Sequence, residues 1–187
     1  MSKSVGKSVT RVDAYEKATG RAKYVADLCD QSALVARILH ATIAHGYVKS
    51  IDTTEAEAVP GVVKVLTCFN VPDYRFPTAG HPWSTDPARK LLNRRVRIYG
   101  DDIAAVIAEN EIAAAQAVRA LKVEYEELPF VLDVQKAMEP DAPQIHEDCP
   151  GNVLKHTDIR RGDYQTAIQE PGLIRVEGWY DTPTVQH

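Results

Sequence analysis

The sequence predicts an α/β (α+β) fold, and three observations support this class. Short apolar runs rich in β-branched residues recur between residues 33 and 125. Helical segments with start signals separate some of these runs. Pro and Gly stand between the segments, where strands and helices have to end.

Composition indicates a globular protein without a polyanionic partner. The 187 residues are 44% hydrophobic and 26% charged, with a formal net charge of −4 and no Lys/Arg cluster along the chain. We therefore expect neither nucleic acid nor a membrane as partner. The sequence shows no apolar run of membrane-spanning length and no secretory signal in residues 1–10, so we expect a cytoplasmic location.

The first strands should surround a short helix. Residues 33–43, ALVARILHATI, are almost all apolar and predict a central strand buried on both faces. Residues 47–52 alternate as a strand, and Thr54 with Glu57 fits a capping box that starts a helix. Residues 62–66, VVKVL, then complete a β-α-β unit.

A second β-α-β unit is expected over residues 100–125. Residues 95–99 and 103–108 predict strands around a turn, and Asn110 can cap a helix. Residues 123–125 alternate with glutamates as a closing strand. The buried side of the helix should carry four residues at helical spacing: Ala114, Ala117, Val118 and Leu121.

These patterns divide the chain into four parts. Residues 1–28 are a polar N-terminal arm, residues 29–128 the α/β domain, residues 129–150 a Pro-rich linker, and residues 151–187 the truncated start of a further domain. In the last part we expect a helix over residues 161–169 and a strand over residues 173–181.

The motifs indicate no catalytic and no metal-ligating residue, and cofactor-binding residues stay unassigned. Gly6, Lys7 and Ser8 resemble the end of a phosphate-binding loop, but the first Gly of that motif and the preceding strand are missing. His40 and His45 are five positions apart, so on one strand they point to opposite faces and would not share a metal ion.

Acidic and cysteine residues also favour structural roles. Asp101 and Asp102 belong to a predicted turn, and Glu124, Glu126 and Glu127 to the solvent side of a predicted strand. The three cysteines, widely spaced and without a C-x-x-C pair, should be reduced, buried or half-buried thiols. They are Cys29, Cys68 and Cys149.

An ordered series of motifs resembles the large subunits of the xanthine dehydrogenase/aldehyde oxidase family. It begins with Arg11-Val12-Asp13 and Lys17-Ala18-Thr19-Gly20, followed by Ala22, Tyr24 and Asp27. It continues through IAHGYVKSIDTTEAEAVPGVVKVLT, VPD, YGDDIAAVIAENEIAAAQAV, VEYEELP, IH, NVLKHTDIRRGD and RVEGWYDTPTVQH. A counterpart of Thr78–His81 and Trp83 makes it most similar to the separate-subunit bacterial xanthine dehydrogenases.

The resemblance implies the N-terminal part of a molybdenum-binding subunit, with an a/b hammerhead domain and the first elements of the molybdopterin-binding domain. It implies hydroxylation of purines, related heterocycles or aldehydes by a molybdenum-pterin cofactor, which this fragment would not bind. Implied partners are the subunit's own C-terminal molybdenum domain and subunits carrying FAD and 2Fe–2S clusters. The family's glutamate base and most pterin contacts lie downstream, so the fragment alone should be inactive.

Near the end of the chain, His187 is similar to a histidine at the edge of the family's first molybdenum-side segment. Some relatives have a glutamine two residues before that histidine, but here Val185 stands there and Gln186 is offset by one. We therefore expect no cofactor contact from Gln186.

For the fragment itself we expect a packing role, through residues 43–47 and the breaker-rich residues 70–93. Two alternatives stay open. One is a free-standing interaction or scaffold module derived from the hammerhead domain. The other is a small-molecule binder that stacks ligands on Tyr74, His81 and Trp83.

Overall fold

The computed structural model describes residues 5–30, 32–73, 75 and 90–183. At its centre are two three-stranded sheets in which every strand pair is antiparallel. One sheet has the order β1 (Val35–His40), β5 (Asp102–Ala108), β3 (Val62–Thr67); the other has the order β4 (Arg95–Val96), β2 (Gly46–Asp52), β6 (Lys122–Glu127).

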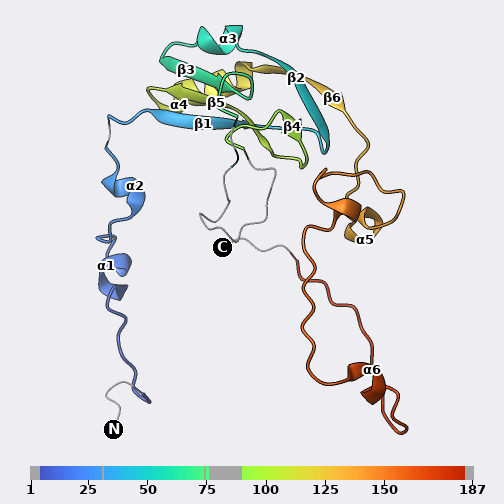
Figure 1. Ribbon diagram of the computed structural model, residues 1–187. Helices are drawn as coiled ribbons and strands as arrows, with labels where there is room; N and C mark the ends of the chain where they lie inside the picture. Colours follow the sequence, from blue (N-terminus) through green and yellow to red (C-terminus); the bar gives the residue numbers. More distant parts are fainter. Residues whose placement is uncertain (1–4, 31, 74, 76–89, 184–187) are drawn as a thin grey trace.

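The helices are short except for α4. Two, α1 (Ala14–Ala18) and α2 (Val25–Leu28), lie in the N-terminal arm, and α3 (Thr54–Glu57) and α4 (Glu111–Ala120) accompany the sheets. Beyond β6 come α5 (Val134–Ala137), a 3-10 turn (Pro150–Asn152) and α6 (Tyr164–Ala167). Both terminal parts extend away from the sheets (Figure 1).

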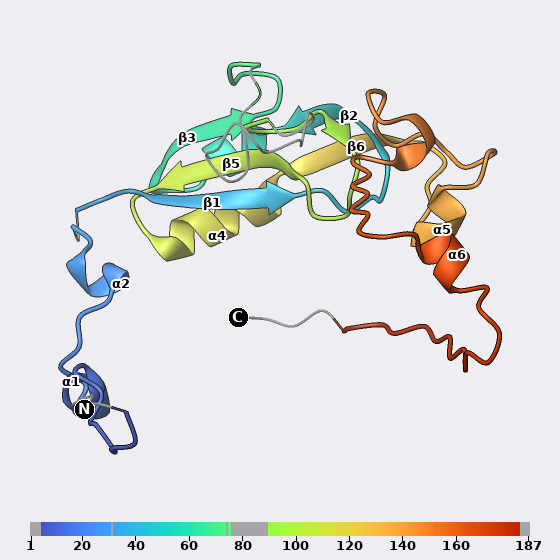
Figure 2. The same ribbon diagram turned by 60° about the horizontal axis from the view of Figure 1, so that its bottom comes forward.

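The core forms where α4 covers one face of the β1-β5-β3 sheet (Figure 2), with α3 in contact with α4 and β3. Ala117 of α4 and Leu121, which directly follows the helix, pack there with Val65 and Val106. A second cluster joins the two sheets, because Val48 of β2 and Ile103 of β5 are both fully buried in it. The expected side of the helix is thus confirmed, with Ala114, Ala117 and Leu121 buried and Val118 partly buried.

The α+β class is confirmed, but the two β-α-β units are not classical crossovers. Strand, helix and strand follow each other as expected, yet β2 and β3 belong to different sheets, and so do β5 and β6. Each helical connection therefore leads from one sheet to the other. Parallel pairing, which a crossover within one sheet would give, is absent from the described strands.

The prediction of a doubly buried central strand over residues 33–43 is wrong. Strand β1 lies at the edge of its sheet, and Ile38 remains 42% exposed. Arg37, in the middle of the apolar run, reaches solvent and approaches Glu111 at 3.6 Å. A charged side chain of this kind is typical of an edge strand.

Three smaller expectations need correction. Helix α3 is capped by Thr53 rather than Thr54, and the Thr53 hydroxyl donates to the Glu57 carboxylate at 2.9 Å. Strand β4 is only two residues long, because Asp101 accepts the backbone N–H groups of Arg97 and Ile98. Residues 173–181 form no strand among the described residues, where no neighbouring strand supplies backbone partners.

Candidate functional site

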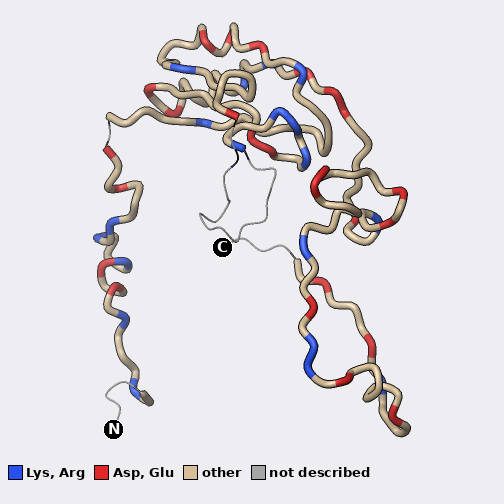
Figure 3. Tube along the Cα trace, viewed as in Figure 1, with Lys and Arg blue, Asp and Glu red and all other residues tan. Residues whose placement is uncertain are grey.

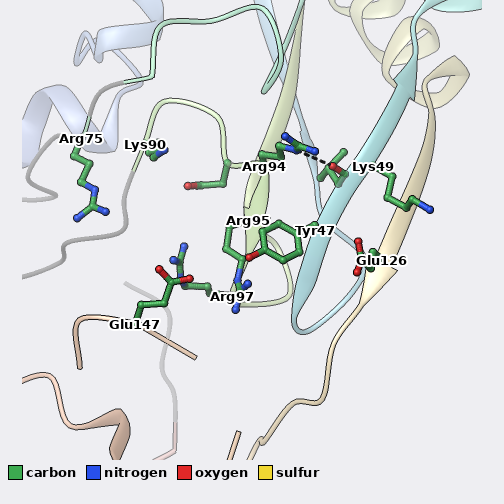
Figure 4. A pocket seen from close by; sticks show the side chains of 11 residues that line it. Tyr47, Lys49, Arg75, Lys90, Arg94, Arg95, Arg97, Glu126 and Glu147 are labelled. Atoms are coloured by element: carbon green, nitrogen blue, oxygen red, sulfur yellow. Dashed lines mark hydrogen bonds between the residues drawn. The ribbon is translucent and has the colours of Figure 1, made fainter. Parts of the chain in front are cut away.

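A cleft of about 620 Å³ lies beside β2 and β4. The strands contribute Tyr47, Val48 and Lys49 from β2, Arg95 from β4 and Glu126 from β6. The other lining residues come from the flanking loops: Arg75, Lys90, Asn93, Arg94, Arg97 and Glu147 (Figure 4).

The cleft is strongly basic, and we call it the basic cleft. Six of its lining residues are cationic and two are acidic, in a chain whose net charge is −4. Figure 3 shows the basic residues at β4 against the mixed charges of the rest of the trace. The six are Lys49, Arg75, Lys90, Arg94, Arg95 and Arg97.

Only part of this positive charge is neutralised by carboxylates. Arg75 approaches Asp148 at 3.5 Å, and Lys90 forms an ion pair with Asp73. Within the described part of the chain, the other four cations have no carboxylate within 4.0 Å. The cleft therefore keeps a local excess of positive charge, which Glu126 and Glu147 on its lining only partly offset.

Arg95 is held in place by His45 and Tyr47. Its Nη2 lies 2.8 Å from His45 Nε2, and its guanidinium lies over the Tyr47 ring at 4.4 Å from the centroid. Because arginine can only donate, Nε2 has to accept, so the ring proton is on Nδ1. Nδ1 then donates to the carbonyl oxygen of Pro129 at 2.6 Å.

Arg97 lies in the same partly desolvated environment. Its Nε donates to the carbonyl oxygen of Ile145 at 3.1 Å. Burial lowers the pKa of Arg97, and the nearby charge of Arg95 lowers this pKa further. An anion in the cleft would relieve both effects.

Arg94 contacts strand β2 and the Phe69 ring, but its guanidinium forms no ion pair with a described carboxylate. Its Nε lies 3.4 Å from the carbonyl oxygen of Val48, and its guanidinium lies 5.4 Å from the centroid of the Phe69 ring. The Lys49 side chain makes no hydrogen bond or ion pair with any described residue. The arrangement can bind anions, but it offers no nucleophile with an adjacent base.

His40 and His45, which are not expected to share a metal ion, lie in different environments. His40 lies on the exposed edge strand, with Nδ1 2.9 Å from a carboxylate oxygen of Asp102. His45 is buried, 4% exposed, and bonds to Arg95 and Pro129. Asp101 serves the turn before β5, as described above.

The glutamates of β6 are exposed. Glu124 accepts a hydrogen bond from the Ser50 hydroxyl at 2.9 Å, whereas Glu126 lines the basic cleft. Gly6, Lys7 and Ser8 lie in a turn and extended segment of the arm, with no helix directly after them.

The cysteines are free thiols in three different environments. Cys149 is buried and Cys68 is partly buried, but Cys29 is exposed, contrary to the expectation of a half-buried thiol. Cys29 directly follows α2, and its thiol donates to the carbonyl oxygen of Val25 in that helix. Burial raises the pKa of Cys68 to about 11.

Several expected residues lie outside the described residues. These are Tyr74, Thr78, His81, Trp83, Val185, Gln186 and His187, and most of the expected packing segment 70–93, since residues 74 and 76–89 are not described. The contact expected through residues 43–47 is largely wrong, because Ile43, His45 and Gly46 are buried within the chain itself.

Across residues 5–30, 32–73, 75 and 90–183, no three His, Cys, Asp or Glu side chains converge in a way that could hold a metal ion. In the same parts of the chain, no helix has the length and hydropathy of a membrane span.

Sequence reasoning missed the basic cleft. The signal was the closely spaced Arg94, Arg95 and Arg97, which look unremarkable in an acidic chain. Antiparallel pairing of β2 with β4, Tyr47 opposite Arg95, brings Lys49 to the same cleft.

The fold and sequence have clear relatives. The family described as "Aldehyde oxidase and xanthine dehydrogenase, a/b hammerhead domain" matches residues 19–129. A xanthine dehydrogenase molybdenum-binding subunit from Escherichia coli O157:H7 is 39% identical over 95% of this chain and 24% of its own length. The nicotinate dehydrogenase large molybdopterin subunit of Eubacterium barkeri is 34% identical over 98% of this chain and 41% of its own length.

Solved structures agree with the sequence relatives. The aldehyde oxidoreductase from Desulfovibrio gigas superposes with a TM-score of 0.65 at 34% identity, covering 75% of this chain and 16% of that one. The reconstituted CO dehydrogenase from Oligotropha carboxidovorans gives a TM-score of 0.65 at 33% identity, over 76% and 18% of the two chains. The chain thus spans about a quarter or less of most of these relatives. It belongs to the aldehyde oxidase and xanthine dehydrogenase family and is an N-terminal portion of one of the family's large subunits, with the a/b hammerhead domain.

Proposed function

We propose that this chain is the packing portion of a molybdenum hydroxylase that oxidises purines, related heterocycles or aldehydes, and that it is inactive alone. The observation that carries the proposal is the 39% identity with a xanthine dehydrogenase molybdenum-binding subunit over 95% of the chain. A relative that is a nicotinate dehydrogenase subunit supports the wider class of heterocycles.

The cofactors of the complete enzyme are part of the proposal. A molybdenum-pterin cofactor, bound by residues outside the described ones, would supply the redox chemistry. FAD and 2Fe–2S clusters on partner subunits would carry the electrons away. We place this assembly in the cytoplasm, and we place the domain boundaries at residues 28, 128 and 150.

Exposed apolar side chains support a packing role for the terminal parts. In the C-terminal part, Ile174, Val176 and Tyr180 are 91%, 89% and 89% exposed. In the N-terminal arm, the Val12 and Val25 side chains are similarly exposed to solvent. Apolar side chains spaced along an extended segment stabilise a protein only when another surface covers them.

One face of the β1-β5-β3 sheet provides a further packing surface. Ile38, Ala105 and Leu66 are opposite one another in adjacent strands. They lie on the face away from the core cluster that α4 covers. Other domains of the large subunit would bury this row.

Hydrogen exchange tests the packing role. Amide exchange in residues 9–28 and 173–181 is measured in this chain alone and in the full-length large subunit. We expect at least ten-fold slower exchange in the full-length subunit, while α4 changes little. Equally fast exchange of both segments in the two proteins would contradict the packing role and favour the free-standing scaffold module.

A further inference from the structure

We propose that the basic cleft beside β2 and β4 is a docking site for a carboxylate-rich polypeptide segment. Four of its six cations have no carboxylate within 4.0 Å among the described residues. This inference concerns binding and does not depend on the oxidation reaction proposed above.

The cations lie along the cleft and do not converge on one point. In Figure 4, Arg75 and Lys90 are on one side, Lys49 is on the opposite side, and Arg94 and Arg97 point in different directions. A single phosphate group would contact only a few of them. A polypeptide with several carboxylates along its length can contact each cation in turn.

The chain's own acidic linker already uses the rim of the cleft. Glu147 is a lining residue, and Asp148 approaches Arg75 at 3.5 Å. Next to them, the carbonyl oxygen of Ile145 accepts a hydrogen bond from Arg97. The rim thus contacts a turn of the acidic linker through the Asp148 carboxylate and the Ile145 carbonyl oxygen, and the cations without an ion pair extend this surface beyond it.

The arginines suit a protein partner. Guanidinium groups bind carboxylates in a bidentate geometry and lose less hydration than ammonium groups at an interface. Arg95 Nε is buried without a hydrogen-bond partner among the described residues. Tyr47, under the Arg95 guanidinium, adds an aromatic contact of the kind enriched at protein interfaces.

Phosphate-bearing ligands fit less well. The described lining residues belong to strands and loops, so no helix N-terminus directs N–H groups into the cleft. Glu126 and Glu147 also line the cleft, so a compact dianion would lie close to these carboxylates, whereas the carboxylates of a polypeptide can be spaced to contact the cations that lie away from them.

The test is an NMR titration of the ¹⁵N-labelled 187-residue chain. Probes are an acetylated hexaglutamate peptide, the matching hexaglutamine peptide, inorganic phosphate and a short oligothymidylate. We expect shifts confined to residues 47–49 and 93–97 with hexaglutamate, and none with hexaglutamine. Raising NaCl from about 20 to about 200 mM should weaken binding roughly ten-fold, because exposed charges are screened.

Matched variants localise the binding. The double variant Lys49→Gln/Arg94→Gln should bind hexaglutamate about five-fold more weakly, since each exposed charge pair contributes modestly. The control Arg37→Gln/Lys64→Gln, on β1 and β3, removes the same charge and should bind like the wild type. If the double variant changes the overall spectrum, the single Lys49→Gln variant, about two-fold weaker, gives the same comparison.

Three results would overturn the proposal. Unchanged affinity in the cleft variants would show that hexaglutamate binds elsewhere. Equal weakening by the control pair would indicate a nonspecific charge effect. Tighter binding of phosphate or oligothymidylate than of hexaglutamate at the same residues would assign the cleft to a phosphate-bearing ligand.

Discussion

Arg95 Nη2 lies 2.8 Å from Nε2 of His45, a buried imidazole whose other nitrogen donates to the carbonyl oxygen of Pro129. One side chain thereby connects the loop before β2, strand β4 and the segment after β6. The two hydrogen bonds of His45 fix the tautomer with the proton on Nδ1, and the bond to Arg95 holds that side chain beside Tyr47 in the basic cleft.

Replacing His45 should therefore destabilise the domain. His45→Ala leaves the Pro129 carbonyl and Arg95 without this partner and creates a cavity, at a cost of about 3 kcal/mol in the free energy of unfolding. Urea denaturation followed by circular dichroism measures the change. His40→Ala, on the exposed edge strand, is the control and should cost less than about 0.5 kcal/mol. If His45→Ala and His40→Ala lowered the free energy of unfolding equally, the claim that His45 links these segments would be wrong.

Gly46 should tolerate no side chain. A Cβ at this position would overlap the backbone carbonyl oxygen of Glu126 in the neighbouring strand, and the Ile43 side chain would also be too close. Gly46→Ala should lower the free energy of unfolding by about 2 kcal/mol or more, because the backbone of β6 would have to move.

The matched control for that change is Gly100→Ala. Gly100 also has a positive φ, of 99°, but nothing lies within 4 Å of its Cβ position. Its substitution costs only backbone strain, about 1 kcal/mol. A Gly46→Ala variant as stable as Gly100→Ala would show that the strands are further apart than described.

Much of the local structure follows from the sequence because it depends on neighbours along the chain. The start of α4 is an example, since Asn110 caps a helix whose periodic apolar side is buried as expected. The alternation of β6 is another. Sheet membership depends instead on pairing between distant segments, so the edge position of β1 was not readable from an apolar run.

The basic cleft illustrates the same limit. Lys49 and Arg95 are far apart in sequence and share the cleft only because β2 pairs with β4. Net charge is summed over the whole chain, so an overall value of −4 conceals a local excess of positive charge. The burial of residues 43–47 likewise results from contacts with β4 and β6.

The cap of α4 gives a third prediction. Asn110 Oδ1 accepts the Ala113 N–H at 2.9 Å, so Asn110→Ala should cost about 1 kcal/mol of unfolding free energy. Asn110→Asp retains the acceptor and should stay within about 0.5 kcal/mol of the wild type. The free energies of unfolding of the wild type and the two variants are compared by thermal and urea denaturation. An Asn110→Ala variant as stable as the wild type would show that the cap contributes nothing.

Cys68 should react slowly with alkylating reagents. Burial raises the pKa of its thiol to about 11, so the reactive thiolate is scarce at neutral pH. Between pH 7 and pH 9, its rate of modification by iodoacetamide should rise about ten-fold per pH unit. Peptide mapping by mass spectrometry follows the reaction, with exposed Cys29 as the internal reference. Cys68 labelling as fast as Cys29 at pH 7 would contradict the raised pKa.

The same shift has a consequence for stability. The folded state favours the neutral thiol, so the contribution of Cys68 is fully present below the ordinary thiol pKa of 9.0 and is lost as the pH rises toward about 11. A Cys68→Ala variant should therefore lose less stability than the wild type between pH 9 and pH 11.

The central claim is that this chain belongs to a longer molybdenum hydroxylase subunit, and the source reading frame beyond the codon for His187 tests it most directly. We expect the frame to continue for several hundred codons, and its complete product, purified with its partners, to contain molybdenum by elemental analysis. A stop codon directly after His187 in the native gene would contradict the claim and make the free-standing scaffold module the better account.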